Sequence, residues 1–402
     1  MDINNLKNIQ TVLDDAVKSN YLAGTNLLVY KDGKELGYWQ SGMADIEMEK
    51  KYSRDTIFRL YSMSKPVTCV AAMILVEEGK LDLAEEAANY IPAFWNLQVC
   101  TEKGRSGKPR KALRNILIQD LLNMTSGYTY GAWSEESPRG EHLTSDLIMK
   151  LNEDVAGENK ITTQEVAEQL AGIPVSFEPG TDYNYGLSAD ILGAVIEKAS
   201  GMKFSQFLKK RIFDPLGMED TAFYVSEDKQ NRLSKVYKCV RNDNVQKLEL
   251  FTDGHLGIQA EMDHAPAFES GGAGLCSTVD DYMKFALMLT NDGELNGKRI
   301  LQKKTVDFLC HARLRDDLQQ KFNQKMPHLC GYTYCNLLRV AYEPGKANTI
   351  TDYEEFGWDG WLGPYVSVDL KNNLTIVMTM QRTDTGTSAP TRRVKNIIYS
   401  SL

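Results

Sequence analysis

Strand-like and helical patterns follow one another along this chain in an order that restricts its fold. Near the start, two runs at 25–30 and 34–39 flank Lys31-Asp32-Gly33, and an Asp-Gly between such runs is typical of a β-hairpin. Three further strand-like runs lie far away at 331–340, 362–369 and 374–381. The long segment between these ends carries mostly helical spacing. We therefore expect an α+β fold, in which helices flank an antiparallel sheet and a mostly helical domain is inserted.

The helical segments are recognised by apolar residues three and four positions apart. They are 5–20, a long helix that Gly79 ends, 116–123, 142–152, 163–171, 188–199, 203–212 and 278–291. This pattern predicts a discontinuous sheet domain made of 1–82 and 265–402. Residues 83–264 are predicted to form the mostly helical domain.

Charge and composition restrict the partners of the protein. The chain has 402 residues, with 46 Lys and Arg against 54 Asp and Glu, and a net charge of −8. An acidic chain argues against nucleic acid as the main partner, because phosphate binding favours a basic surface. The basic run at 102–114 is interrupted by glycines and a proline, which indicates a solvated loop or hairpin.

The sequence also predicts the cellular compartment of the protein. No apolar run is long enough for a membrane-spanning helix, so no membrane partner is expected. The first residues lack the basic and apolar regions of a secretory signal. The seven cysteines are odd in number and scattered, which favours reduced thiols and a cytoplasmic location.

The segment Ser62-Met63-Ser64-Lys65 is the first candidate for catalytic chemistry. A serine hydroxyl is a weak nucleophile unless a base accepts its proton. On a helix, residues three apart share a face, so Lys65 can reach the Ser62 oxygen. A lysine acts as a base only when neutral, which requires a lowered pKa.

The same S-x-x-K spacing occurs at Ser200 and Ser226, so the pattern alone is weak. Only Ser62 lies between an apolar extended run, residues 56–61, and a long helix with an apolar face. The structural alternative is that Ser62 merely caps this helix. The residues by themselves favour neither alternative.

A second candidate is Tyr185, which follows a Pro-Gly turn and directly precedes a predicted helix. A tyrosine held beside a lysine ammonium has a lowered pKa and can act as a general base. The alternative is an ordinary packed aromatic side chain.

The third candidate is the stretch from Phe356 to Tyr365, where three glycines and a proline lie among aromatic residues before the strand 362–369. Such glycines indicate that something, such as a ligand, closely approaches the backbone. The alternative is a loop with core tryptophans.

Other enzyme classes lack their motifs in this chain. The five histidines form no His-x-x-x-His pair, and the spacing of the cysteines near His328 is not a zinc pattern, so no metal is expected. The Gly-x-Ser-x-Gly of α/β-hydrolases and the Gly-Lys-Ser/Thr of nucleotide-binding loops are also absent, and no cofactor is expected.

Taken together and in this order, the three candidate segments resemble the serine β-lactamase and penicillin-binding protein superfamily. The resemblance is strongest to the class C β-lactamase-like hydrolases, including the family VIII carboxylesterases. It extends over roughly residues 10–380, and includes stretches 121–127, 213–218 and 270–278. It implies that fold, with the active site in the cleft between the two domains.

The resemblance also implies a role for individual residues. Ser62 would be the acylated nucleophile, Lys65 would share its proton, and Tyr185 would be the base and acid. Backbone N–H groups of Ser62 and Trp361 would form the oxyanion hole. The positions implied to bind substrate are Tyr130, Leu187, Trp358, Asp359 and Gly360.

Two departures from the family pattern bear on the substrate. Leu187 stands where Tyr-x-Asn has its asparagine, and Trp358 stands where Lys-Thr-Gly has its lysine. Loss of the lysine removes a charge-assisted contact worth about 1.5–3 kcal/mol to an anionic substrate. We therefore expect a serine hydrolase that forms an acyl-enzyme on small neutral esters and cleaves β-lactams weakly.

Three alternatives remain on the same fold. The chain could be a β-lactamase or D-Ala-type peptidase, or an acyltransferase that passes the acyl group to an alcohol or amine. A binding protein without catalytic activity would be expected to lack part of the Ser62, Lys65 and Tyr185 set. The oligomeric state is not indicated by the sequence.

Overall fold

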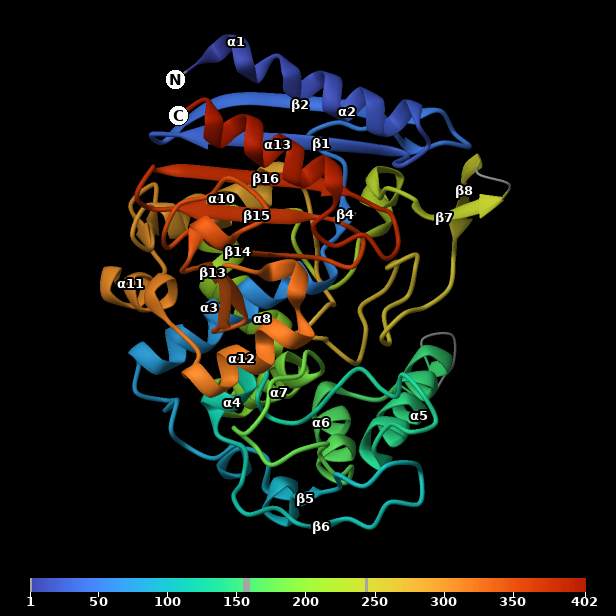
Figure 1. The fold of residues 1–402 in the computed structure, drawn as a ribbon, viewed down its shortest axis with the longest axis vertical. Helices are drawn as coiled ribbons and strands as arrows, with labels where there is room; N and C mark the ends of the chain where they lie inside the picture. The colour runs from blue at the N-terminus through green and yellow to red at the C-terminus, as the bar shows by residue number, and fades with distance from the viewer. Residues whose placement is uncertain (1, 155–159, 243–244) are drawn as a thin grey trace.

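Strands from both ends of the chain form one antiparallel sheet, as the sequence predicts. The computed structural model describes residues 2–154, 160–242 and 245–402. The eight-stranded sheet has the order β12-β13-β14-β15-β16-β1-β2-β3, and the two ends of the chain meet where β1 pairs with β16 (Figure 1). The strands are β1 Gly24–Lys31, β2 Lys34–Asp45, β3 Lys50–Lys51, β12 Tyr332–Cys335, β13 Leu338–Ala341, β14 Phe356–Asp359, β15 Tyr365–Asp369 and β16 Leu374–Met380.

The first hairpin forms where it is predicted. Lys31 pairs with Lys34, and Asp32 and Gly33 between them have φ angles of 52° and 71°. A two-residue turn that matches the strand twist needs positive φ at both positions, which Gly adopts freely and Asp tolerates.

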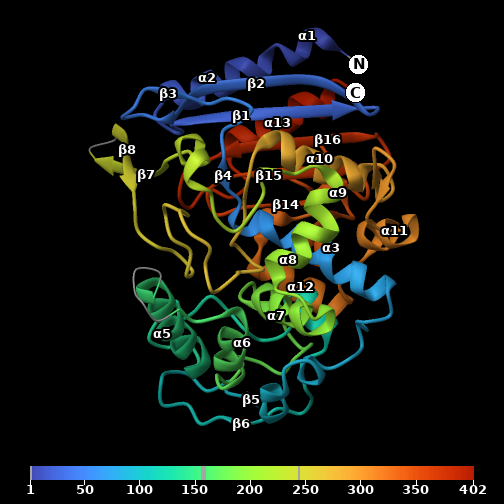
Figure 2. The same ribbon diagram turned by 180° about the vertical axis from the view of Figure 1, so that it is seen from behind.

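Helices cover both faces of the sheet. On one face, α2 (Asn8–Lys18) and α13 (Ala389–Ser400) bury a cluster that includes Leu13, Ile376 and Val394. On the other face, α3 (Ser64–Glu77) and α10 (Val279–Thr290) belong to the largest core of the protein (Figures 1 and 2). The helix α3 is buried along nearly its whole length, so its side chains meet the rest of the protein on all sides.

A group of further helices lies below α3 in Figure 1. In this group α7 packs against α3, α4 and α6. Besides the helices whose bounds are given above, the α-helices among the described residues are α1 Ile3–Leu6, α4 Ile118–Leu122, α5 Arg139–Asp154, α6 Thr163–Ala171, α7 Ser188–Ser200, α8 Phe204–Leu208, α9 Asp214–Leu216, α11 Lys303–His311 and α12 Asp316–Lys325. The division into two domains at residues 82/83 and 264/265 stays a prediction.

Several predicted elements differ from the structure. The run 331–340 is two strands, β12 and β13, because Asn336 and Leu337 adopt positive φ angles of 54° and 59° and reverse the chain. The helix at 203–212 is interrupted after Leu208 by a π-helical turn, Lys209–Phe213. The helices α11, α12 and α13 were not predicted. The buried face of α13 includes Thr391 and Lys395, and polar residues hide such a face from apolar periodicity.

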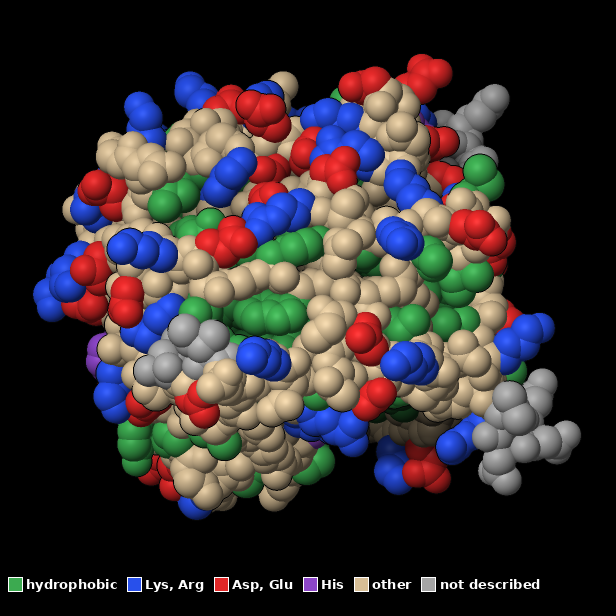
Figure 3. Space-filling model, turned by 90° about the horizontal axis from the view of Figure 1, so that it is seen from above, with side chains coloured by type: hydrophobic (Ala, Val, Ile, Leu, Met, Phe, Trp, Pro, Cys, Tyr) green, Lys and Arg blue, Asp and Glu red, His purple; other side chains and the backbone are tan. Residues whose placement is uncertain are grey.

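The charged side chains of the surface are mixed in sign on one face of the molecule, where basic and acidic side chains are interspersed (Figure 3). The basic run at 102–114 contains the exposed strand β6, Arg110–Lys111, which pairs with β5, Gln98–Val99, so the run supplies one strand and the connection of a two-stranded hairpin. Of the helices in the described part of the chain, none has the length and apolar character that a bilayer span requires.

Candidate active site

Ser62 lies in a strained turn directly before α3. It is the middle residue of a 3₁₀ turn, Tyr61–Met63. The preceding residue Tyr61 has a φ of 44°, which residues other than Gly rarely adopt. The Tyr282 hydroxyl donates to the Met63 carbonyl at 2.7 Å and holds the turn from α10. Strain that is maintained by surrounding contacts is typical of functional sites.

Lys65 contacts Ser62 from the first turn of α3, as the spacing predicts. Its Nζ lies 3.1 Å from the Ser62 Oγ and donates at 2.9 Å both to the Tyr130 hydroxyl and to the Gly272 carbonyl. The Lys65 side chain is completely buried. The ammonium or amine of Lys65 is therefore held in one position, next to the hydroxyl of Ser62.

The environment of Lys65 makes it a base near neutral pH. Burial lowers its pKa from 10.5 to about 7, although the carboxylates of Asp190 and Asp359 act in the opposite direction. A large fraction of Lys65 is then neutral at pH 7 and can accept a proton. The sequence analysis required this lowered pKa.

Asp190 positions the chain segment that holds Lys65, and the sequence analysis missed it. This buried residue of α7 accepts hydrogen bonds from the Ser270 hydroxyl and from the Gly272 N–H at 3.1 Å. Gly272 in turn offers its carbonyl to Lys65. The available signal was the position of Asp190 among the small and apolar residues of the first turns of α7, because buried charges need partners.

Tyr185 lies close to Lys65 although 120 residues separate them in the sequence. The Lys65 Nζ is 4.7 Å from the centre of the Tyr185 ring, and the Tyr185 hydroxyl accepts a hydrogen bond from the Trp358 Nε1 at 2.8 Å. The rings of Tyr130 and Tyr185 meet edge to face at 5.7 Å. The buried Tyr334 of β12, which was also missed, packs against Tyr185 at 6.0 Å.

The expected lowering of the tyrosine pKa is wrong. Burial raises the pKa of Tyr185 and of Tyr130. Hydrogen bonding to Ser62 lowers the pKa of each phenol, but this effect is smaller than that of burial. Since Lys65 loses much of its charge, it cannot stabilise a phenolate as a full ammonium would. Both tyrosines are therefore protonated at neutral pH and suited to donate a proton.

Trp358 and Asp359 lie at the end of β14 and point to opposite faces of the sheet. Trp358 is 3% exposed and contacts Tyr185, whereas Asp359 accepts a hydrogen bond from the Thr387 hydroxyl next to α13. The backbone here is closely approached by the chain itself. A Cβ on Gly357 would lie 2.1 Å from the Val366 carbonyl oxygen of β15.

Gly360 brings the chain after β14 against the turn that carries Ser62. A Cβ on Gly360 would lie 2.2 Å from the carbonyl oxygen of Leu60, and the rings of Tyr61 and Trp361 meet at 5.0 Å. Within the described residues, neither the N–H of Ser62 nor that of Trp361 donates a hydrogen bond. Two free donors on adjacent segments are what an oxyanion hole requires.

Leu187, one of the predicted substrate positions, adds little surface to this site. It is 4% exposed at the N-terminal end of α7 and packs in the main core. Because the residue is a leucine, it offers no side-chain amide to a substrate, as the sequence predicts.

The described part of the chain shows no group of three or more His, Cys, Asp or Glu side chains that could hold a metal ion. All seven cysteines are free thiols.

Comparison with known proteins agrees with this geometry. The beta-lactamase family model matches residues 9–398, almost the whole chain. The chain belongs to the beta-lactamase family. The family and the fold expected from the sequence are thereby confirmed.

Three relatives illustrate the range of this family. Protein Rv1367c of Mycobacterium tuberculosis is 30% identical, with coverage of 94% of this chain and 90% of that protein. Esterase EstB of Burkholderia gladioli is 27% identical, with coverage of 98% and 94%. The structure of EstCE1, described as a hydrolase with promiscuous acyltransferase activity, superposes with a TM-score of 0.79 at 25% identity and covers 98% of this chain and 99% of that one.

Proposed function

We propose that this protein is a serine esterase that cleaves small neutral esters through an acyl-enzyme on Ser62. The observation that carries the proposal is the contact of 3.1 Å between the Ser62 Oγ and the Nζ of a buried Lys65 whose pKa is about 7. A nucleophile within reach of a base that is partly neutral at working pH is the minimal arrangement for acyl transfer.

The first half of the reaction forms the acyl-enzyme. Neutral Lys65 accepts the Ser62 proton while the Ser62 Oγ attacks the ester carbonyl. The N–H groups of Ser62 and Trp361 bind the resulting oxyanion. When the tetrahedral intermediate collapses, the bond between its carbon and the leaving oxygen breaks, and the alkoxide takes a proton from a tyrosine. The protonated Lys65 then gives a proton to that tyrosine. Tyr185 or Tyr130, each protonated and close to Ser62, passes that proton on.

The second half regenerates Ser62. A water molecule attacks the acyl carbonyl and gives its proton to the same Lys65 and tyrosine system. The Ser62 Oγ leaves and takes a proton back, and the carboxylic acid is released.

Two residues favour neutral esters over β-lactams and peptides. Trp358 donates its N–H to Tyr185 and offers no ammonium to a substrate carboxylate, and Leu187 offers no amide. The likeness to EstB, an esterase, supports the ester as substrate class. Slow β-lactam cleavage remains chemically open to this site, since acylation needs only Ser62 and its base.

Acyl transfer to an acceptor such as an alcohol is a second candidate function, because EstCE1 is described as a hydrolase with promiscuous acyltransferase activity. The same acyl-enzyme would serve, with an alcohol in place of water. Product analysis of an aryl ester reaction with added alcohol would detect the new ester and measure its share.

Substitution of the nucleophile tests the proposal. We expect Ser62→Ala to lower the hydrolysis of a short aryl ester by about 10³-fold or more. Unchanged turnover would refute the role of Ser62. Intact-mass detection of an organophosphonate adduct on the peptide that contains Ser62 gives an independent readout.

The two tyrosines are distinguished by Tyr185→Phe and Tyr130→Phe. Because Tyr130 receives the hydrogen bond of Lys65 and Tyr185 that of Trp358, the structure allows either to relay the proton. The sequence resemblance favours Tyr185, whose loss should reduce kcat by about 10²–10⁴-fold. A larger kcat loss in Tyr130→Phe would transfer the role to Tyr130.

We also place the protein in the cytoplasm. Seven free thiols agree with a reducing compartment.

A further inference from the structure

Two buried cations, Arg339 of β13 and Lys395 of α13, lie on the face of the sheet that α13 covers. Each side chain is 3% exposed. Both cations pair with one carboxylate, that of Glu355, at 3.0 Å from Arg339 and 2.8 Å from Lys395. Two positive charges therefore share one negative charge in the interior, and a buried charge without a counter-ion costs free energy.

The hydrogen bonds of the Arg339 guanidinium are incomplete. Its Nη2 donates to Glu355 at 3.0 Å, whereas its buried Nη1 has no hydrogen-bond partner among the described residues. The Lys395 ammonium, in contrast, contacts the Tyr332 hydroxyl at 2.9 Å, the Thr351 hydroxyl at 3.2 Å and the Glu355 carboxylate at 2.8 Å. Buried donors in proteins are nearly always paired, so Arg339 lacks an acceptor that the chain itself does not supply.

A cavity of about 340 Å³ opens beside these two cations. Its buried lining includes Tyr332, Arg339, Tyr365 and Lys395, and its exposed rim includes Asn348 and Arg392. The Arg339 guanidinium lies over the Tyr365 ring, 4.4 Å from its centre. The cavity therefore extends from the surface of the molecule to the side chain that lacks an acceptor.

The lining of the cavity carries more positive than negative charge. Its Lys and Arg residues are Arg339, Arg392 and Lys395, and its acidic residue is Asp359. When Glu355 is counted as well, three positive charges face two negative ones. In the part of the chain that the structure describes, Asp359 forms no ion pair with either buried cation. A small anion in the cavity would balance the excess.

The cavity is separate from the site around Ser62. Successive side chains of β14 point to opposite faces of the sheet, so Asp359 lines the cavity whereas Trp358 contacts Tyr185. The lining does not include Ser62, Lys65 or Tyr185. A molecule bound here would leave the catalytic groups free.

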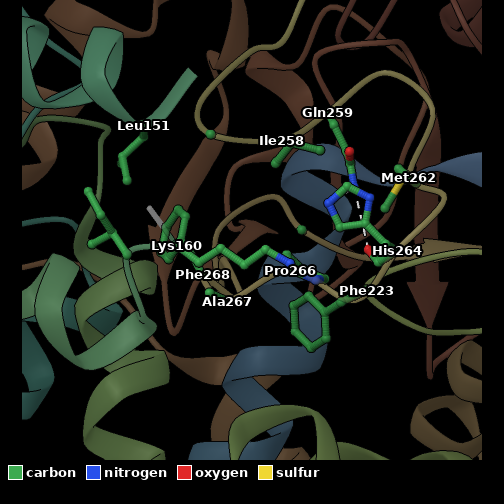
Figure 4. A pocket seen from close by; sticks show the side chains of 13 residues that line it. Leu151, Lys160, Phe223, Ile258, Gln259, Met262, His264, Pro266, Ala267 and Phe268 are labelled. Carbon is green, nitrogen blue, oxygen red and sulfur yellow. Dashed lines mark hydrogen bonds between the residues drawn. The ribbon is translucent and has the colours of Figure 1, made fainter. Parts of the chain in front are cut away.

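Size distinguishes this cavity from the one shown in Figure 4. The cavity in Figure 4 has a volume of about 50 Å³, and two of its polar side chains contact each other, with the Gln259 Nε2 3.3 Å from the His264 Nδ1. A cavity of roughly 150 Å³ holds a benzene molecule, so about 50 Å³ is too small for an organic ligand, whereas about 340 Å³ has room for a ring and a charged group. Of the two, the cavity beside Arg339 combines that room with a buried donor that lacks a partner.

We propose that the cavity beside Arg339 and Lys395 binds a small organic carboxylate. The carboxylate accepts a hydrogen bond from Arg339 and supplies the negative charge that the two buried cations lack, because carboxylates are among the strongest acceptors for a guanidinium. The rings of Tyr332 and Tyr365 give the cavity apolar walls, which favour a compact aromatic acid over inorganic phosphate. This binding does not depend on the proposed esterase activity.

Isothermal titration calorimetry of the full chain tests the proposal with benzoate as the probe. We expect benzoate to bind with a Kd of about 1 mM or tighter, and benzamide, which has the same shape without the charge, to bind at least about tenfold more weakly. Inorganic phosphate should also bind more weakly than benzoate. A benzoate Kd weaker than about 1 mM, or equal binding of benzamide, would overturn the proposal. Tighter binding of phosphate would overturn the carboxylate as the class of ligand.

Substitutions locate the bound benzoate. Arg392 and Arg393 are neighbouring exposed residues of α13, but only Arg392 lines the cavity. We expect Arg392→Glu to weaken benzoate binding about fivefold or more at low ionic strength, and the matched control Arg393→Glu to change it less than about twofold. Arg339→Gln removes the buried cation and should weaken binding about tenfold or more, with melting curves to show that the variant is folded.

Two results of these substitutions would refute the cavity as the binding site. The first is that Arg392→Glu weakens benzoate binding no more than Arg393→Glu does. The second is that a folded Arg339→Gln protein binds benzoate as tightly as the wild type.

Discussion

Gly360→Ala tests whether the backbone after β14 forms half of an oxyanion hole. The added Cβ would lie 2.2 Å from the Leu60 carbonyl oxygen and 2.8 Å from the Pro364 Cγ. Heavy atoms at such distances repel, so one backbone segment must move away by about 1 Å. The movement separates Trp361, the next residue, from the turn that carries Ser62.

The expected effect falls on kcat. A misplacement of about 1 Å costs roughly 10²-fold, and loss of one oxyanion donor costs about 10²–10³-fold, or 2.7–4 kcal/mol. We therefore expect kcat for a neutral aryl ester to fall by about 10²-fold or more, with a smaller change in KM. Steady-state kinetics measure both parameters.

A matched glycine provides the control. A Cβ on Gly345 would meet no atom within 4 Å, so Gly345→Ala should leave both kinetic parameters close to those of the wild type. Melting curves show whether Gly360→Ala is folded. A folded Gly360→Ala protein with kcat within about threefold of the wild type would contradict the proposed oxyanion hole.

Two further predictions follow from buried charges. Because Lys65 must be neutral to accept a proton, kcat/KM for an uncharged ester should rise with pH through about 7. It should not fall again at any higher pH at which the tyrosines stay protonated. A pH profile of kcat/KM without that rise would refute Lys65 as the base. Glu355 is fully buried between Lys395 at 2.8 Å and Arg339 at 3.0 Å, and although burial alone would raise its pKa, these cations lower it from 4.5 to about 2. Its charge therefore stabilises the fold above pH 4.5, and this contribution is lost as the pH falls from 4.5 to about 2. Glu355→Gln should reduce the free energy of unfolding at pH 7 by about 3–5 kcal/mol in urea titrations, and a loss below about 1 kcal/mol would contradict this assignment.

The sequence was most informative about the site where the relevant contact is local. Lys65 follows Ser62 by three residues, so helical geometry alone predicts their contact, and the structure confirms it at 3.1 Å. Asp190 was missed because its partners, Ser270 and Gly272, are about 80 residues away. The pKa of Tyr185 was predicted in the wrong direction, because the extent of burial around a phenol depends on distant segments.

The fold shows the same division. The hairpin at Asp32-Gly33 depends on the backbone conformations of these two adjacent residues, and it was predicted correctly. The helix α13 was missed because its inward face carries Lys395, whose charge is buried only because Glu355 from another part of the chain lies beside it. From the sequence alone, a lysine such as Lys395 is predicted to be exposed, because lysine is almost never fully buried unless it is paired.

What the amino-acid order by itself determined here is the short-range part of the protein: its turns, most of its helices, the Ser62 and Lys65 pair, and the family to which the chain belongs. Only the tertiary structure decided how protons and charges are distributed in the site. Burial and Coulomb interactions depend on the distance between atoms in space, and residues more than a hundred positions apart supply most of the groups that surround Lys65.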